Sequence, residues 1–423
     1  MKIMYVNPYA GSLEHGMQLR PYYLAREWVR QGHEVTMIAA SYSHLRSKQP
    51  ASTGRLTGEE IDGIRYLWLK TPAYEGNGLA RVCNMLVYAW ALLRWRKQLA
   101  ASCRPDVVIA SSPHPFCIYG AKAIAEKTRA TLIFEVRDLW PLTLIELGNI
   151  SPRHPFVMLM QAAEDYAYRV SDRVVSLLPK ADRYMVKRGM DPHKFFHIPN
   201  GIDAAEWQEV FAGRLPQEHR QTIERFKREG YFLVGYTGAH GLADSLEHLV
   251  EAGVGLQNRR VALLLVGQGP EKESLRRLAE ANRLTDVCFL PPVPKAAIPE
   301  FLAQMDALYI GWKKEPIYQY GISPNKLFDY LMAAKPVIHG IEDEGNLVAV
   351  CNAGVTIPPE DPQAIAEAIL ALQAMDPAER DEMGRRGREY VKAEHDFSHL
   401  AEQFLAGIVS PSTCNCHDGL ERS

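Results

Sequence analysis

The sequence is poor in cysteine, with seven residues scattered through 423 positions. An odd number without regular spacing excludes the disulfide framework of a small secreted domain. We therefore expect a reducing, cytoplasmic compartment. Three possible metal ligands, Cys414, Cys416 and His417, lie together near the C-terminus, but a closed zinc site needs a fourth. No other cluster has metal-ligand spacing, so we predict a protein that works without a metal or cofactor.

Long hydrophobic runs are also absent. The apolar stretch at residues 2–6 is shorter than the core of a signal peptide, and we expect a first β-strand there instead. The continuous apolar part of residues 79–97 is about ten residues long, which is too short to span a membrane. A hydrophobic content of 47% and a charged content of 23% predict a globular chain with two cores.

Net charge is small, at −2, but the two halves of the chain differ. Residues 1–200 hold 26 Lys and Arg against 17 Asp and Glu, whereas residues 201–423 hold 22 against 33. A basic first half suits an anionic acceptor or membrane surface, and an acidic second half is unsuited to nucleic acid. Surface charge adjusted only for solubility would give the same counts, so this alternative stays open.

Strand-like apolar runs alternate with helical periodicity, which is the pattern of parallel α/β sheets. We predict strands at residues 2–6, 34–39, 106–110, 131–136, 173–177, 195–198, 231–237, 261–266, 287–290, 307–311, 336–339 and 354–357. Helices are predicted near residues 17–31, 80–100, 115–128, 153–170 and 180–188, and a polar linker at 205–230. The fold class is thus α/β with two Rossmann-like domains, and ligands are expected at the carboxyl ends of the strands.

Residues 320–338 hold the most informative pattern. Ser323 followed by Pro324 predicts an N-cap with proline in the first helical turn, so that backbone N–H groups and the helix dipole point outward. Lys326 adds a positive charge, and Asp329 is placed to accept a hydrogen bond from a ribose hydroxyl. We interpret this segment as a phosphate site, with an ordinary capped helix as the alternative.

A short glycine loop follows the first predicted strand. Gly11 and Gly16 flank this loop, which leads into a helix expected to begin near Met17, with Arg20 one turn in. Glycines allow backbone N–H groups to approach a phosphate or a sugar closely. A structural turn, with Arg20 in a surface ion pair, is the alternative.

Three charged residues, Glu135, Arg137 and Asp138, stand at the end of the strand predicted at residues 131–136. Charges directly after an apolar run need partners or a polar cleft, so this segment is a second candidate site. A buried structural pair of Arg137 with Glu135 or Asp138 is the alternative.

The segment at residues 320–338 resembles the donor-binding loop and helix of family 4 glycosyltransferases, which follow a pattern of the form S-P-x-K-L-x-E-Y-x-A-x-x-x-P-V-I. Residues 11–17, 134–141, 199–203 and 267–271 also fit that family, in the expected order, and the resemblance covers about residues 1–408. It implies the GT-B architecture, in which two Rossmann-like domains face each other across a cleft.

The resemblance also implies a domain organisation and roles for single residues. We expect domains at residues 1–204 and 231–375, helices at 376–408 that cross back to the first domain, and a disordered tail at 409–423. The donor-binding residues it implies are Gly11, Gly16, Arg20, Gly238, His240, Gly267, Ser323, Pro324, Asn325, Lys326 and Asp329. The catalytic residues are Glu135, Arg137, Asp138 and Lys326, and those on the acceptor side are Glu14, His15 and His114.

The chain departs from the family pattern at several charged positions. Members commonly carry an arginine and a lysine in the first loop of the donor domain, where this chain has Ala239 and Asp244. Gly321 replaces a frequent glutamate, and Arg137 stands where histidine is common. Positive groups that could still meet a leaving diphosphate are the helix N-terminus, Lys326, Arg20, Arg137 and His240.

Residues 79–97 combine aromatic and aliphatic side chains with basic residues at both ends, namely Arg81, Arg94, Arg96 and Lys97. This composition suits a helix that lies on an anionic membrane near a lipid-linked acceptor. A core helix of the first domain is the alternative.

We therefore predict a retaining glycosyltransferase that moves a sugar from a nucleoside diphosphate, preferably UDP, to a hydroxyl of a lipid-linked glycan. Within the family, the chain resembles bacterial enzymes that transfer acetamido sugars such as N-acetyl-L-fucosamine in O-antigen or capsule synthesis. The location expected is the cytoplasm or the inner face of the plasma membrane. Two alternatives stay open: a sugar-nucleotide epimerase and a non-catalytic sugar-nucleotide-binding partner.

Overall fold

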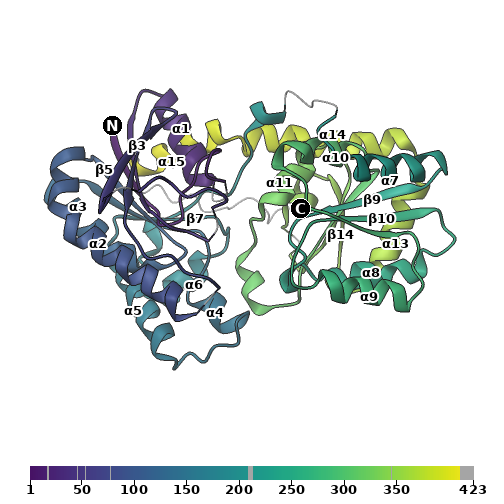
Figure 1. Cartoon of the computed structure of the whole chain (residues 1–423), viewed down its shortest axis with the longest axis horizontal. Helices are drawn as coiled ribbons and strands as arrows, with labels where there is room; N and C mark the ends of the chain where they lie inside the picture. Colours follow the sequence, from purple (N-terminus) through teal and green to yellow (C-terminus); the bar gives the residue numbers. More distant parts are fainter. Residues whose placement is uncertain are drawn as a thin grey trace, which may run out of the picture. The chain divides into compact units, whose positions relative to one another are not determined.

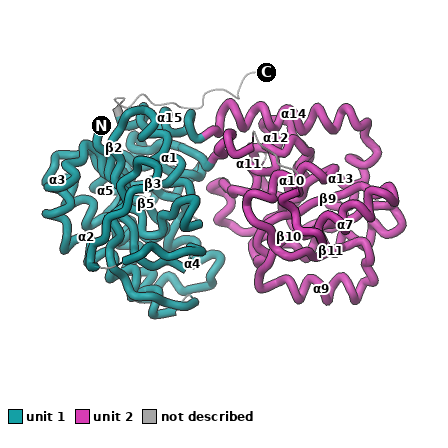
Figure 2. Tube along the Cα trace, turned by 45° about the horizontal axis from the view of Figure 1, so that its top comes forward, with its two compact units in different colours: residues 1–200, 397–423 teal, residues 201–396 magenta. Residues whose placement is uncertain are grey.

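The computed structural model describes residues 1–16, 19–44, 46–52, 54–76, 78–207, 213–343 and 345–409. The chain divides into two compact units (Figure 2): unit 1 comprises residues 1–200 and 397–423, and unit 2 comprises residues 201–396. Each unit is an α/β fold around its own sheet, as predicted. No helix within the described ranges is long and apolar enough to cross a membrane.

Unit 1 is built on an eight-stranded sheet in the order β3-β4-β2-β1-β5-β6-β7-β8. All neighbouring strands are parallel except β3 and β4, which form an antiparallel hairpin at the edge. The strands are β1 Lys2–Val6, β2 Glu34–Ala40, β3 Leu56–Ile61, β4 Ile64–Leu69, β5 Val107–Ser111, β6 Thr131–Val136, β7 Arg173–Ser176 and β8 Phe195–His197.

Helices cover both faces of this sheet (Figure 1). One face packs against α1 (Arg20–Arg30) and α15 (Phe397–Val409). The ring of Tyr23 stacks on Phe397 at 4.8 Å, and Trp28 Nε1 donates to the carbonyl of Ala401 at 3.0 Å. The other helices of this unit are α2 Leu79–Cys103, α3 Ile118–Thr128, α4 Leu142–Glu146, α5 Pro155–Val170 and α6 Asp182–Lys187.

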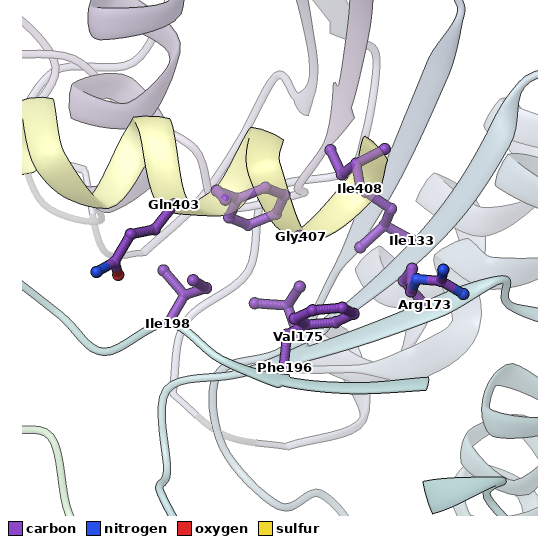
Figure 3. Close-up of a pocket in the computed structure, with 9 residues that line it drawn as sticks. Ile133, Arg173, Val175, Phe196, Ile198, Gln403, Gly407 and Ile408 are labelled. Atoms are coloured by element: carbon purple, nitrogen blue, oxygen red, sulfur yellow. The ribbon is translucent and has the colours of Figure 1, made fainter. Parts of the chain in front are cut away.

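The last helix, α15, lies close against β8 (Figure 3). A Cβ atom at Gly407 would lie 3.0 Å from Cδ1 of Phe196, so only glycine allows this approach without displacing the ring. A small apolar hollow beside the contact is lined by Ile133, Val175 and Ile198 among others. This packing fixes the C-terminal segment within unit 1.

Unit 2 is built on an all-parallel sheet of six strands in the order β11-β10-β9-β12-β13-β14. The strands are β9 Phe232–Thr237, β10 Val261–Val266, β11 Val287–Leu290, β12 Ala307–Gly311, β13 Val337–Gly340 and β14 Gly354–Ile357. The helices are α7 Gln217–Arg228, α8 Leu246–Gly255, α9 Lys272–Ala281, α10 Ile298–Ala303, α11 Asn325–Met332, α12 Leu347–Val350, α13 Pro362–Ala374 and α14 Pro377–Glu394.

Two apolar cores form on the two faces of this sheet (Figure 1). One core joins the strands to α7, α10, α11 and α14, and the other joins them to α8, α9 and α13. Consecutive strand residues such as Leu233 and Val234 enter opposite cores, because side chains alternate along a strand. Burial on both faces explains why these strands read as continuous apolar runs in the sequence.

The hairpin of β3 and β4 is the one pair of strands that the sequence pattern did not predict. Its turn residues, Asp62 and Gly63, both have positive φ, at 51° and 76°. An Asp-Gly pair between short strands is a strong signal for such a hairpin turn. The Asp-Gly pair was the missed evidence.

The boundary between the units differs from the prediction. Residues 205–230 were expected to be a linker, but they contain α7, whose Ile223 and Phe226 are buried in a core of unit 2. The carboxylate of Glu300 also accepts backbone N–H bonds from residues 213–215 at 2.7–3.0 Å. Unit 2 therefore begins at residue 201.

The return of the chain to unit 1 is shorter than expected. Helix α14 was predicted to cross back, but it packs on α11 of unit 2, and Arg388 Nε donates to the carbonyl of Met332 at 2.7 Å. Only residues from Phe397 onward belong to unit 1. Residues 410–423, which contain the Cys414, Cys416 and His417 group, lie outside the described residues, as does Met17.

Candidate functional site

Two glycine loops meet at the carboxyl edge of the sheet in unit 2. Gly238 follows β9 with φ 146°, and Gly267 follows β10 with φ 155°. A Cβ atom at Gly267 would lie 1.8 Å from the carbonyl oxygen of Gly238, and one at Gly269 would lie 2.3 Å from that of His240. Gly267, a predicted donor-binding residue, and Gly269 are therefore required for this backbone contact, whereas a Cβ atom at Gly238 would lie 3.1 Å from Lys326 Nζ.

Lys326 lies in the first turn of α11, next to these loops. Its Nζ donates to the Tyr236 hydroxyl at 2.8 Å and forms an ion pair with Asp244. The ammonium also lies 4.6 Å from the centre of the Tyr236 ring. Burial lowers the pKa of Lys326, whereas the Asp244 carboxylate raises it. The positive charge predicted for a phosphate is thus compensated by a neighbouring carboxylate.

The start of α11 differs by one residue from the prediction. Ser323 was expected to be the N-cap, but Pro324 occupies that position and Asn325 is the first helical residue, with no side-chain cap. Proline has no N–H group to satisfy and its extended backbone leads directly into the turn. The backbone N–H groups of the first turn still point out of the helix, one residue later than predicted, which is the geometry that an anion site at a helix N-terminus needs.

Asp329 lies one turn along the same helix, as the spacing predicted. Burial raises the pKa of its carboxyl to about 7, Lys295 lowers it, and Glu206 raises it further. A half-buried carboxyl of this kind can accept hydrogen bonds from neutral hydroxyl groups. The ribose role predicted for it fits this environment.

His240 is completely buried, and neither of its ring nitrogens has a hydrogen-bond partner among the described residues. The ring lies between Tyr236, at 5.9 Å, and Phe289, at 6.2 Å. Burial lowers its pKa to about 4, and the nearby cations Lys272, Lys326 and Arg276 lower it as well. His240 is therefore a neutral group within a cationic part of the site.

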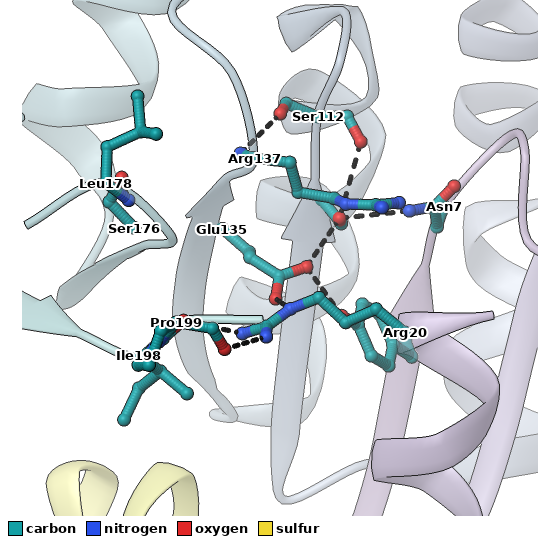
Figure 4. Close-up of polar contacts among 11 residues, drawn as sticks. Asn7, Arg20, Ser112, Glu135, Arg137, Ser176, Leu178, Ile198 and Pro199 are labelled. Carbon is teal, nitrogen blue, oxygen red and sulfur yellow. Dashed lines mark hydrogen bonds and ion pairs between the residues drawn. The ribbon is translucent and has the colours of Figure 1, made fainter. Parts of the chain in front are cut away.

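In unit 1, Glu135 was predicted to be catalytic, and the structure buries it (Figure 4). Its carboxylate accepts hydrogen bonds from Tyr5 at 2.5 Å, Ser111 at 2.6 Å and Arg20 Nε at 3.0 Å. Burial alone would raise the pKa of Glu135, but Arg20 and Arg137 hold it below its ordinary value. Three donors from three different elements give this carboxylate a structural role.

Arg20 was predicted to bind the donor, and it is buried as well. Besides Glu135, its guanidinium bonds the carbonyl of Ile198 at 2.9 Å and that of Pro199 (Figure 4). These bonds join α1, β6 and the segment after β8 within unit 1. Arg20 thus links parts of unit 1 internally. This matches neither its predicted donor-binding role nor the alternative, a surface ion pair.

Arg137 and Asp138 follow β6, as predicted. The backbone N–H of Arg137 donates to Ser112 Oγ at 2.8 Å, and burial lowers the pKa of its guanidinium while Glu135 raises it. Asp138 accepts from Thr143 Oγ1 at 2.9 Å and Trp140 Nε1 at 3.2 Å, and burial raises its pKa. Asp138 thus holds the turn that leads into α4.

The loop from Gly11 to Gly16 is folded onto the hairpin strands. Tyr66 donates to the Gly11 carbonyl at 2.8 Å, and a Cβ at Gly16 would lie 2.6 Å from Ser47 Oγ. His15 is buried against Trp68 and bonds Ser12 Oγ at 2.8 Å, so it is not presented to an acceptor. Of the predicted residues in this loop, only Glu14 is exposed.

His114 is buried within a group of aromatic rings, namely Tyr9 at 5.9 Å, Tyr88 at 6.4 Å and Phe116 at 5.7 Å. Neither ring nitrogen has a hydrogen-bond partner within the described part of the chain. Burial lowers its pKa to about 3, and Arg81 lowers it further. Arg81 itself lies over the rings of Tyr9 and Trp140.

Sequence reasoning missed the partners of the charged groups. Tyr236 and Asp244 hold Lys326, and Asp244 had been noted only as a departure from a family pattern. Contacts between residues 82 or 90 positions apart leave no local signal in the sequence. Within the described ranges, no group of three or more His, Cys, Asp and Glu side chains is placed to hold a metal ion.

Two family models match the chain. A glycosyl transferase 4-like domain matches residues 15–201, and a domain described as glycosyl transferases group 1 matches residues 231–374. WcaI of Escherichia coli K12, described as a candidate colanic acid biosynthesis glycosyl transferase, is 23% identical over 401 residues. That match covers 90% of this chain and 93% of WcaI.

Solved structures share the fold at low sequence identity. Sucrose-phosphate synthase from Thermosynechococcus elongatus superposes with a TM-score of 0.70 at 17% identity, covering 96% of this chain and 97% of its own. Anabaena HepE in complex with UDP and glucose gives 0.66 at 15% identity, covering 97% and 100%. The chain thus carries a glycosyl transferase 4-like domain followed by a glycosyl transferases group 1 domain on a GT-B fold, and it is a glycosyltransferase.

Proposed function

We propose that the protein is a retaining glycosyltransferase that moves a sugar from a UDP-linked donor to a hydroxyl of a lipid-linked glycan. HepE has been determined with UDP-glucose, which supports a nucleotide-sugar donor for this fold. The description of WcaI supports a place in cell-surface polysaccharide synthesis. An acetamido sugar added during O-antigen or capsule synthesis is the specific form of the proposal, and retention follows from the family resemblance.

The observation that carries the proposal is the arrangement at the start of α11. Lys326, the outward N–H groups of the first turn and the loop at Gly238 lie together, and Asp329 follows one turn later. The N–H groups and Lys326 would bind the diphosphate, and Asp329 would accept a ribose hydroxyl. Positive groups fixed at a leaving diphosphate stabilise the charge that develops as the sugar bond breaks.

The position of Asp244 beside Lys326 favours a second candidate function, that of a non-catalytic sugar-nucleotide-binding partner. Its carboxylate already compensates Lys326 and would repel a diphosphate at the same place. Binding of a donor must therefore displace this carboxylate or add further positive charge. Turnover separates the two candidates, because a binding partner would hold the nucleotide without transferring the sugar.

On the acceptor side, we assign His114 and Glu14 of unit 1, as the family resemblance implies. The buried imidazole beside Tyr9, together with Arg81 above that ring, places polar groups among aromatic surfaces. Aromatic faces with a few polar groups are typical of small-molecule and sugar sites. His15 is no longer proposed, because its ring packs against Trp68 and its Nδ1 already bonds Ser12 Oγ, whereas neither nitrogen of His114 has a hydrogen-bond partner among the described residues.

Helix α2 offers a surface for the membrane that carries such an acceptor. Its buried face packs in unit 1, and its opposite face exposes Leu79 by 87%, Leu86 by 43% and Trp90 by 65%. Arg94 and Lys97 continue this exposed face, because residues three or four apart share one side of a helix. Apolar groups followed by cations suit an anionic lipid surface. We therefore assign the membrane-surface interpretation to the exposed face of α2 and the core-helix interpretation to its buried face.

Two of the four basic residues assigned to this surface are engaged elsewhere. Arg81 lies over the rings of Tyr9 and Trp140, and Arg96 Nη1 donates to the carbonyl of Leu93 at 2.6 Å. The membrane surface that we propose is therefore the α2 stripe, defined as Leu79, Leu86, Trp90, Arg94 and Lys97. A peripheral location on the inner face of the plasma membrane is part of this proposal.

The reaction is tested by incubating the protein with a panel of UDP-sugars and a polyprenyl-diphosphate-linked acceptor in the presence of EDTA. We expect UDP release with transfer of one sugar and retention of anomeric configuration, because Lys326 and α11 are assigned the role that a metal ion plays elsewhere. Activity restored only by magnesium or manganese would refute the metal-free mechanism. Binding without transfer across the panel would favour the non-catalytic partner.

The diphosphate site predicts opposite effects for the two members of the ion pair. Lys326→Ala should weaken UDP binding by about 10- to 100-fold, since a charge-assisted contact of about 1.5–3 kcal/mol is lost. Asp244→Asn should tighten binding, up to about tenfold, because it removes a like charge. Calorimetry measures both affinities, and weaker binding by Asp244→Asn would show that this carboxylate is itself a ligand for the nucleotide.

Asp329 predicts a pH-dependent contribution to nucleotide binding. Only the ionised carboxylate accepts from both ribose hydroxyls, and its pKa of about 7 means that it gains a proton as the pH falls through neutrality. The ratio of parent to Asp329→Asn affinity for UDP should be largest near pH 8 and approach one near pH 6. For inorganic pyrophosphate, which has no ribose, the ratio of the two affinities should be one at both pH values. A ratio independent of pH would remove Asp329 from the ribose site.

The α2 stripe predicts salt-sensitive binding to acidic vesicles. Each basic residue near an anionic surface contributes about 1 kcal/mol, so Arg94 and Lys97 together give about 30-fold in affinity. In cosedimentation, Arg94→Ala with Lys97→Ala should lose most binding to acidic vesicles, and Trp90→Ala should weaken it further. Lys122→Ala, on the neighbouring helix α3, serves as the control. Equal binding to neutral vesicles, or none to acidic ones at low salt, would contradict the proposal.

A further inference from the structure

The proposed nucleotide site contains a buried imidazole, that of His240. Both ring nitrogens of His240 lack a hydrogen-bond partner among the described residues, although the side chain is fully buried. A buried polar group without a partner costs free energy, so such groups in folded proteins call for an explanation. If the side chain at position 240 served only to fill apolar space, leucine or phenylalanine would do so equally well.

The backbone of His240 is held in place by the second glycine loop. The N–H of His240 donates to the Gln268 carbonyl at 3.1 Å, and its own carbonyl accepts from the N–H of Glu271 at 3.1 Å. The close approach of Gly269 to the His240 backbone leaves no room for a Cβ atom. Two bonds and one close contact therefore fix the His240 backbone, from which the imidazole projects, against the second glycine loop.

Nε2 of His240 and Nζ of Lys326 approach the same glycine junction. A Cβ at Gly267 would lie 3.2 Å from His240 Nε2, and one at Gly238 would lie 3.1 Å from Lys326 Nζ. Gly238 and Gly267 themselves touch through the Gly238 carbonyl. The imidazole and the ammonium thus both lie close to the contact between the two glycine loops.

Burial lowers the pKa of His240 most, and the charged groups around the ring lower it further. Lys272 and Arg276 of α9 and Lys326 of α11 all disfavour its protonation. Lys272 Nζ is engaged by the carbonyls of Gly267 and Leu290, at 2.7 and 2.8 Å, and Lys326 is paired with Asp244. Tyr236 contributes its ring and a hydroxyl that donates to the Ala239 carbonyl. A diphosphate arriving here would bring negative charge that reverses this balance.

We propose that His240 takes up a proton from solvent when the diphosphate of the donor binds, and that the resulting imidazolium supplies positive charge which Ala239 and Asp244 do not provide. The inference rests on the proposed function, because it needs a diphosphate at the start of α11. His240 would then be a residue that contacts the sugar-nucleotide donor and whose protonation is coupled to binding of that donor. Loss of the diphosphate as product then returns the proton to solvent, so the affinity for the diphosphate should fall as the pH rises.

The direct test is an NMR titration of the His240 Cε1–H signal with and without UDP. His240→Gln, or His240→Asn if the first variant does not fold, identifies the signal by its absence. Without UDP, the signal should stay at the neutral position from pH 8 to pH 5.5. With saturating UDP, it should titrate with a midpoint raised by about two pH units or more, since an opposite charge at close range favours the charged ring.

The same spectra contain a matched control. His219 is also buried in unit 2, where it bonds the carbonyl of Pro291 at 2.9 Å, and its signal should be unchanged by UDP. If UDP binds and His240 stays neutral down to pH 5.5, the inference is refuted while the proposed function stands. If UDP does not bind at all, the proposed function fails first. Proton uptake on UDP binding that persists in His240→Gln would place the proton on another group and would also refute the inference.

Discussion

The ion pair between Lys326 and Asp244 sets the charge that unit 2 can offer to a ligand. Lys326 is placed by the first turn of α11 and by the Tyr236 hydroxyl, so its position depends on the parallel order of β9 and β12. Because Asp244 compensates this ammonium, Lys326 alone adds little net positive charge to the proposed diphosphate site. The role proposed for His240 follows from that compensation.

The fold was largely predictable because buried parallel strands leave strong apolar runs in the sequence. Every predicted strand is present, with no end shifted by more than one residue, whereas the hairpin at Asp62 and Gly63 was missed. Its first strand, β3, has no fully buried residue and therefore leaves no continuous apolar run in the sequence. The linker was wrong for a related reason. Helix α7 is so polar that only Ile223 and Phe226 reveal its packing on unit 2.

The site was predicted less completely, because residue types can be read from a sequence but their partners cannot. Lys326 and Asp329 were found through the spacing of one helix, and both lie where expected. Glu135 and Arg20 were assigned to chemistry, yet they bond each other across 115 positions and hold unit 1 together. Local patterns therefore predict which residues lie on one helix, whereas a buried charge pair is recognised only from tertiary structure.

A crystal structure of the protein with UDP tests the central claim most directly. The account predicts the diphosphate at the N-terminus of α11, with Lys326 Nζ and His240 Nε2 within hydrogen-bond distance of its oxygens. It also predicts that the Asp244 carboxylate has moved away from Lys326, and that a ribose hydroxyl meets Asp329. UDP bound elsewhere, with the ion pair of Lys326 and Asp244 unchanged, would contradict the account.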